Sequence, residues 1–247
     1  MEGIPTNGTP EHDESADDAM SAQTWIGVFG GRFDPIHLGH LAIAEIAHHT
    51  LGLDRILVVP SRMSPHRSAP AGATDVDRLA MVQVAIADHP YLMACELELR
   101  SSAPSYTAIT LRRIREHYAG SQLCFIIGAD AFAEIGTWHD YPDVLHDAHF
   151  AVVSRPGHPV TGLVDTLPSL RTRMHEIPPG ELTPTLHNQE STKIFLIDAV
   201  TPNVSSTGLR ARLASHESLS GLVSAPVESY IAQHQLYTSP SRGKQLA

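Results

Sequence analysis

The chain has 247 residues, of which 42% are hydrophobic, so it is long enough to bury the core of one large domain or two small ones. Seventeen Lys and Arg stand against 27 Asp and Glu, giving a net charge of −10 with 16 histidines counted as neutral. Nucleic acids and anionic membranes are bound through clustered Lys and Arg, so neither is expected as the main ligand. No apolar run approaches a membrane span, no secretory segment is visible, and two cysteines form no disulfide framework. We therefore expect a cytoplasmic protein.

The two ends of the chain differ in composition from its body. Residues 1–22 combine Gly, Pro, Ser and Thr with six acidic side chains, which predicts a disordered acidic tail because little apolar surface can be buried. Residues 238–247 predict a second, flexible tail. Residues 23–237 are expected to form a single domain. Within it, residues 157–192 have weak periodicity and many Pro, Gly, Thr and His, and are interpreted as a variable, partly helical insertion.

Short apolar runs alternate with longer amphipathic stretches along the body of the chain. The runs predict strands at Trp25–Phe29, Arg55–Val59, Leu92–Leu99, Gln122–Ile127, Phe150–Ser154 and Lys193–Ile197. The stretches predict helices at Leu38–Leu51, Asp75–Asp88, Thr107–Tyr118 and Thr207–Ser215. Several strands are apolar on both faces, which suits a parallel sheet covered on both sides. The pattern predicts an α/β fold, a Rossmann-like open parallel sheet with helices on both faces, with ligands bound beyond the carboxyl ends of its strands.

The segment GVFGGRFDPIHLGH joins the first predicted strand to the first helix. Gly30 and Gly31 would let a ligand approach the backbone closely, and His37 and His40 would share one face of the first helical turn. A helix N-terminus with two imidazoles suits a phosphate, and Asp34 before it could serve as a turn or cap residue. A ligand-free tight turn and a zinc-binding histidine pair remain alternatives, although metal-binding helices usually space histidines four apart.

A second candidate anion site lies in the segment NVSSTGLRARL. It places Ser205, Ser206 and Thr207 before a helix that carries Arg210. Ordinary helix capping explains one of these hydroxyls. Three hydroxyls in a row, followed by an arginine, also form an anion site from hydroxyls, amides and a guanidinium. The residues alone leave both interpretations open.

Both segments resemble motifs of the nucleotidyltransferase superfamily of adenylyl- and cytidylyltransferases. The first resembles G-x-F-D-P-x-H-x-G-H, and the second resembles I-S-S-T-x-x-R with Val204 in place of isoleucine. The resemblance implies that His37, His40 and Arg210 are catalytic. It implies ATP binding by Gly30, Gly31, Phe33, Asp34, His37, His40, Ser205, Ser206, Thr207 and Arg210. Arg32 stands where the family usually has Thr or Ser, so a hydroxyl contact at that position would be lost.

The middle of the chain resembles the nicotinate mononucleotide adenylyltransferases of this superfamily. VVPSRMSPHR is similar to their V-P-x-x-x-x-P-H-K loop with Arg67 in place of lysine, and PSYTAITL is similar to P-x-Y-T-x-x-T-L. FIIGADAFAEIGTWHDYPDVL and FAVVSRPG resemble their segments containing G-x-D, a tryptophan and S-R-P-G. The resemblance implies substrate binding by Arg67, Tyr106, Thr107, Gly128, Asp130, Trp138 and Arg155. It implies ATP and nicotinate mononucleotide as substrates, deamido-NAD and pyrophosphate as products in NAD biosynthesis, and Mg²⁺ that arrives with ATP rather than in a protein metal site.

Simpler roles remain open for three of these residues. Trp138 could anchor the core, as Trp25 is expected to, although its polar neighbours favour stacking on a pyridine ring. Asp130 could cap a helix, and Arg155 could be an ordinary surface residue. The rival functions are transfer to nicotinamide mononucleotide or another acceptor such as phosphopantetheine, and a non-catalytic nucleotide-binding regulator. A serine hydrolase is not expected, because the sequence contains no G-x-S-x-G pattern. The sequence leaves a homo-oligomer open.

Overall fold

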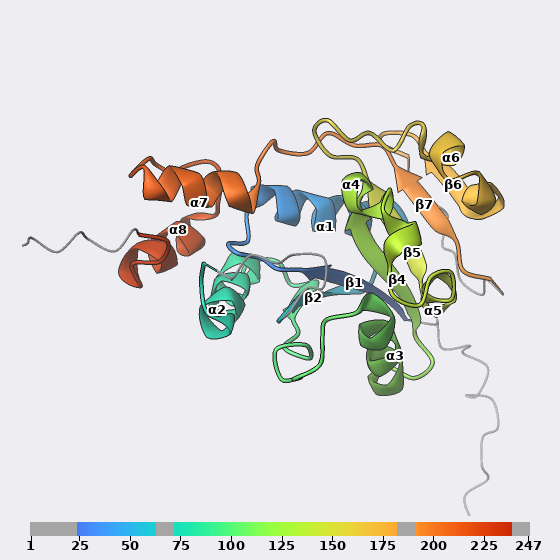
Figure 1. Cartoon of the computed structure of the whole chain (residues 1–247), viewed down its shortest axis with the longest axis horizontal. Helices are drawn as coiled ribbons and strands as arrows, with labels where there is room; N and C mark the ends of the chain where they lie inside the picture. Colours follow the sequence, from blue (N-terminus) through green and yellow to red (C-terminus); the bar gives the residue numbers. More distant parts are fainter. Residues whose placement is uncertain (1–23, 63–71, 182–190, 239–247) are drawn as a thin grey trace, which may run out of the picture.

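The computed structural model describes residues 24–62, 72–181 and 191–238. The tail predicted at residues 1–22, most of the tail at 238–247, and Arg67 lie outside the described residues. The strands are β1 (Trp25–Gly31), β2 (Arg55–Pro60), β3 (Leu92–Ala94), β4 (Gln122–Gly128), β5 (His149–Val153), β6 (Met174–Ile177) and β7 (Ile194–Ile197). They form one sheet in the order β3-β2-β1-β4-β5-β7-β6, and every neighbouring pair is parallel (Figure 1).

Helices cover both faces of this sheet. They are α1 (Leu38–Leu51), α2 (Asp75–Ile86), α3 (Thr107–His117), α4 (Ala129–Phe132), α5 (Val144–Asp147), α6 (Leu163–Thr166), α7 (Ser206–Ala214) and α8 (Ala225–Gln233), with 3-10 turns at Ile135–Thr137 and Pro168–Arg173. Side chains alternate along each strand. In β1, Trp25 and Phe29 therefore pack with α1, α2, α7 and α8, whereas Ile26 and Val28 pack with α3 to α6. Figure 1 shows α1 and α3 on opposite sides of the sheet, which confirms the predicted α/β class.

The ends of α1 follow from local chemistry. His37 is its N-cap residue, in extended backbone conformation. At the other end Gly52 has a φ of +63°, which glycine adopts without strain, and its N–H donates to the carbonyl of His48. None of the described helices is both long and apolar enough to cross a membrane.

Several predicted boundaries are wrong. The strand expected at Leu92–Leu99 ends at Ala94, because the chain turns at Glu96–Arg100 and buries Glu98 against α3. The segment interpreted as an insertion contributes α6 and an edge strand, β6, which was not predicted because its two central residues are exposed and break the apolar pattern. Helix α8 was also not predicted; it packs against α2 and lies with α7 at one end of the molecule (Figure 1).

Candidate active site

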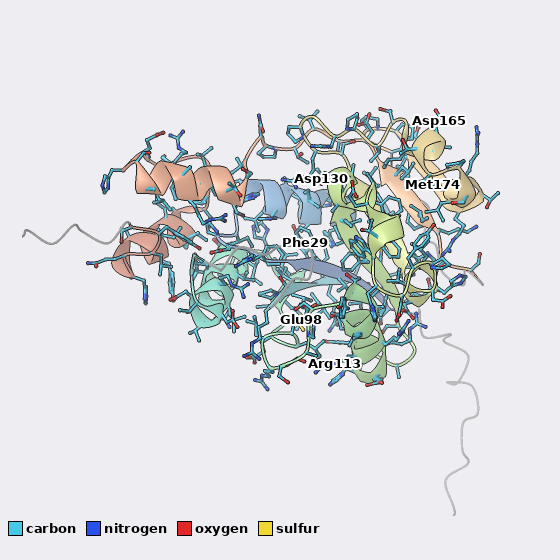
Figure 2. All side chains as sticks on the ribbon, in the orientation of Figure 1. Phe29, Glu98, Arg113, Asp130, Asp165 and Met174 are labelled. Carbon is cyan, nitrogen blue, oxygen red and sulfur yellow. The ribbon has the colours of Figure 1, made fainter. Side chains whose placement is uncertain are left out.

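The strand order reverses at β1, which lies between β2 and β4. In open α/β sheets ligands bind beyond the carboxyl ends of the strands at such a point. A cavity of about 680 Å³ lies there. Every predicted site residue that the structure describes lines it: Gly30, Gly31, Phe33, Asp34, His37, His40, Tyr106, Thr107, Gly128, Asp130, Trp138, Arg155, Ser205, Ser206, Thr207 and Arg210. Figure 2 labels three lining side chains from different parts of the chain, Phe29, Glu98 and Asp130.

His37 and His40 form a reciprocal cap at the start of α1. The backbone N–H of His40 donates to Nδ1 of His37, and the N–H of His37 donates to Nδ1 of His40, each at 3.3 Å. The two rings are stacked with centroids 3.6 Å apart. Because Nδ1 accepts a hydrogen bond in both rings, Nε2 is the nitrogen left to carry the ring proton. Each imidazole therefore presents an N–H donor suited to a phosphate oxygen.

The protein environment keeps His37 neutral. His37 is only 2% exposed, and burial together with the positive charge of Arg155 lowers its pKa to about 3. In the free protein at neutral pH, His37 is thus an uncharged hydrogen-bond donor. A bound polyphosphate would add negative charge and raise that pKa, since a nearby opposite charge favours the charged form.

The second motif is hydrogen-bonded directly to the first. The Ser206 hydroxyl at the start of α7 donates to the carbonyl of Pro35 at 2.9 Å, and Arg210 Nη1 donates to the carbonyl of Asp34 at 2.6 Å. Ser205 is the N-cap of α7 and accepts from the N–H of Gly208 at 3.1 Å. Capping therefore accounts for Ser205 only. The Ser206 hydroxyl and the Arg210 guanidinium join segments 171 and 176 residues apart into one wall of the cavity.

The capping role considered for Asp34 is wrong, because His37 is the N-cap residue of α1. The Asp34 side chain is 2% exposed and accepts from the backbone N–H groups of Gly72 at 2.9 Å and Ala73 at 3.2 Å. It thereby ties the loop after β1 to the chain entering α2. Arg32, the departure from the family pattern, lies with its Nε 3.6 Å from this carboxylate.

Asp130 and Arg155 form an ion pair at the carboxyl ends of β4 and β5. Arg155 Nη1 lies 3.0 Å from Asp130 Oδ2. The capping role considered for Asp130 is wrong, because Gly128 is the N-cap of α4. A Cβ at Gly128 would lie 2.6 Å from both Arg155 Cδ and Asp130 Oδ1, so the pair fits only because this residue is glycine. Arg155 is accordingly part of the cavity wall and not an ordinary surface arginine.

Aromatic rings also line the cavity. Trp138 is half-buried and packs edge-on against Phe125, with centroids 5.9 Å apart at 82°. Tyr106 stacks on His139 at 4.1 Å, and Thr107 begins the 11-residue helix α3, whose N-terminus carries the positive end of its dipole. The fully buried tryptophan is Trp25, as expected from its position in a strand.

Sequence reasoning missed several lining residues, of which Glu98 is the most unusual. Glu98 is 8% exposed and accepts from the Thr110 hydroxyl at 2.6 Å. Burial raises the pKa of its carboxyl group, although hydrogen bonds from Ser105 and Thr110 oppose the shift. An acidic residue within an apolar run was interpreted as part of a strand. Its position two residues after another glutamate could have indicated a turn instead. His139, Ser105 and Thr110 also line the cavity and were not named, although all three lie within segments that resemble the family, Thr110 as the second threonine of P-x-Y-T-x-x-T-L.

Among the described residues, no three His, Cys, Asp or Glu side chains gather closely enough to hold a metal ion. Two acidic residues of the cavity wall already have partners. Asp34 accepts from two backbone amides, and Asp130 pairs with Arg155. These residues do not form a built metal site.

The chain is similar in sequence to proteins of known families. A cytidylyltransferase-like family model matches residues 28–212. The chain is 38% identical over 221 residues to a probable nicotinate-nucleotide adenylyltransferase of Cronobacter sakazakii, covering 87% of this chain and 95% of that protein. It is 39% identical over 214 residues to a protein of the same name from Escherichia coli, covering 85% and 97%.

Solved structures resemble the fold. The structure of Plasmodium falciparum nicotinic acid mononucleotide adenylyltransferase complexed with NaAD superposes with a TM-score of 0.65 at 16% identity, covering 87% of this chain and 98% of that one. A structure of the same protein complexed with APC gives a TM-score of 0.64. At this level of identity the likeness concerns the fold.

Proposed function

Because the chain belongs to the family of nicotinate-nucleotide adenylyltransferases, within the cytidylyltransferase-like group, we propose that it joins ATP to nicotinate mononucleotide. The products are deamido-NAD and pyrophosphate, as in a step of NAD biosynthesis. The observation that carries the proposal is the single cavity lined by both phosphate motifs and by the aromatic acceptor residues.

The phosphate half of the cavity suits ATP. His37 and His40 offer Nε2–H donors, and Arg210 adds a fixed positive charge held against the first loop. Thr207, whose Oγ1 lies 3.3 Å from Arg210 Nη2, and Ser206 place two hydroxyls beside it. Donors that are held before the substrate arrives need no reorganisation when charge develops, which is the main source of such stabilisation. We assign His37, His40 and Arg210 to the pyrophosphate leaving group.

The acceptor half suits a pyridine mononucleotide. Trp138 offers a stacking surface for the ring, and the N-terminus of α3 at Thr107 suits the nicotinate carboxylate. Arg155 lies near enough to His37 to lower its pKa, so its charge reaches the point where the acceptor phosphate would meet ATP. The ion pair with Asp130 holds it there. Arg67 lies outside the described residues and stays a proposed contact to the acceptor.

The reaction requires alignment more than a strong base. An oxygen of the acceptor phosphate forms a bond to the α-phosphorus of ATP while the bond from that phosphorus to the β-phosphate oxygen breaks. The acceptor phosphate is already anionic near neutral pH, so the protein has only to align it and neutralise the departing charge. We propose that Mg²⁺ enters on the triphosphate oxygens and adds to that neutralisation. Because the reaction consumes ATP, we also propose a cytoplasmic location.

The test is pyrophosphate release with ATP and Mg²⁺, with nicotinate mononucleotide, its amide and phosphopantetheine offered in parallel. We expect the acid to be strongly preferred. His40→Ala should lower kcat by about 100-fold or more, whereas His49→Ala, an exposed histidine on the same helix, should stay within about twofold of the parent. Preference for the amide would overturn the proposed acceptor. ATP binding without release of pyrophosphate from ATP in the presence of any of the three acceptors would overturn the enzymatic function.

A further inference from the structure

The carboxylate of Asp34 is a junction between four segments of the chain. Besides the amides of Gly72 and Ala73, it accepts a hydrogen bond at 2.7 Å from the hydroxyl of Tyr237, which lies 203 residues away. Arg210 Nη1 lies 4.0 Å from the same carboxylate and donates to the main-chain carbonyl of Asp34. The loop after β1, the entry to α2, the start of α7 and the end of the described chain therefore meet at one buried charge.

Tyr237 is built into this junction and is not a loose terminal residue. It follows α8 in a left-handed conformation with a φ of +62°, and its ring packs against the core formed with α1 and α2. A Cβ at Gly72 would lie 2.7 Å from two of its ring atoms and 3.1 Å from Arg210 Cδ. The tyrosine ring thus lies directly against the Gly72 backbone, beside the stem of Arg210.

The hydroxyl of Tyr237 remains a donor under all ordinary conditions. Burial and the neighbouring Asp34 carboxylate both raise the pKa of the phenol. A buried carboxylate that accepts too few hydrogen bonds raises the free energy of the folded protein, and it attracts nearby cationic side chains more strongly. Here the cations are Arg32 and Arg210, with Nε and Nη1 at 3.6 and 4.0 Å.

We propose that Tyr237 is a positioning residue for adenylyl transfer: by donating to Asp34 it keeps that carboxylate from drawing Arg210 away from the triphosphate. The proposal rests on the proposed function, because it needs Arg210 to act on ATP. Under this proposal, Tyr237, which follows α8, helps to position Arg210 in the phosphate site.

Tyr237→Phe tests the proposal, because it removes one oxygen atom and keeps the ring against Gly72. We expect kcat to fall roughly tenfold and the KM for ATP to rise several-fold, with the KM for the acceptor within about twofold of the parent. Tyr230→Phe is the matched control. Its hydroxyl, on α8, likewise donates to an aspartate, Asp77 of α2, at 3.1 Å, but neither Tyr230 nor Asp77 lines the cavity. A merely structural role would lower the melting temperature of both variants and would not separate the two substrates.

A double-mutant cycle with Asp34→Asn identifies the route of the effect. If Tyr237 acts through the carboxylate, Tyr237→Phe should change kcat by less than about twofold in the Asp34→Asn background. Equal kcat values for Tyr237→Phe and Tyr230→Phe, or fully additive effects in the cycle, would overturn the proposal. Calorimetric titration with MgATP separates it from the proposed function. If the parent binds MgATP but releases no pyrophosphate, the proposed function is contradicted. The proposal for Tyr237 is then tested by binding alone: Tyr237→Phe should weaken MgATP binding relative to Tyr230→Phe, and equal affinities would overturn it.

Discussion

The buried neutral state of His37 predicts a loss of stability in acid. Its pKa is about 3 in the folded protein and about 6.5 in the unfolded chain, so between these values the unfolded state binds more protons. The stability supplied by the neutral ring is fully present above pH 6.5 and is lost as pH falls towards 3. At pH 4.5 the loss is roughly 2 to 3 kcal/mol, since each pKa unit is worth about 1.4 kcal/mol. His149, 4% exposed with a pKa lowered to about 4 mainly by burial, adds a second contribution of the same sign.

His37→Asn isolates the first contribution. Asparagine keeps a favoured N-cap side chain and does not titrate, so the variant should lose about 1 to 2 kcal/mol at pH 7.5 from packing and capping. As pH falls to 4.5, the difference from the parent should shrink and then reverse. In the parent, His37 takes up a proton in the unfolded chain but stays neutral in the folded protein, which favours unfolding, whereas asparagine does not titrate. Urea unfolding at pH 7.5, 6.0, 5.0 and 4.5 measures the difference. His149→Asn is the control. This variant still contains His37, so its free energy of unfolding should still fall in acid by the amount that His37 contributes. A constant gap between parent and His37→Asn over this range would refute the reasoning.

Three further substitutions probe the cavity. Gly128→Ala places a Cβ 2.6 Å from Arg155 and Asp130, so we expect kcat/KM for the acceptor to fall at least about tenfold; unchanged kinetics would show that the ion pair is not needed in place. Trp138→Ala should raise the acceptor KM about tenfold while calorimetry finds MgATP affinity unchanged, and Trp138→Phe should lie between; equal losses for both substrates would argue against ring stacking. Ser206→Ala removes the bond to the Pro35 carbonyl and should raise the ATP KM several-fold, with the acceptor KM as internal control.

The two helix starts that line the cavity were predictable from the sequence because their geometry is local. His37 and His40 lie three residues apart, and Ser205 to Arg210 lie within two helical turns, so each group is arranged by one helix start. The sheet was also predictable, since runs such as β4 are buried on both faces and resemble no other element. Elements that pack at an edge escaped prediction. In β6, two exposed residues hide the strand pattern.

What the sequence could not provide is the partner of each charge. Asp34 reads as a turn residue beside a proline, and nothing near it indicates that Tyr237 will donate to it from the far end of the chain. Asp130 likewise reads as a helix cap until β5 brings Arg155 within 3.0 Å. Both carboxylates follow a strand at the reversal point of the sheet, Asp34 after β1 and Asp130 after β4, where segments distant in sequence converge. At such a point the residues of each motif are close in sequence, whereas the residues that pair with their charged groups come from distant parts of the chain. Arg32, which departs from the family pattern, illustrates this. Its charge lies beside the Asp34 carboxylate that also contacts Arg210, so the contact that we propose between Arg210 and ATP depends on how that one carboxylate is shared.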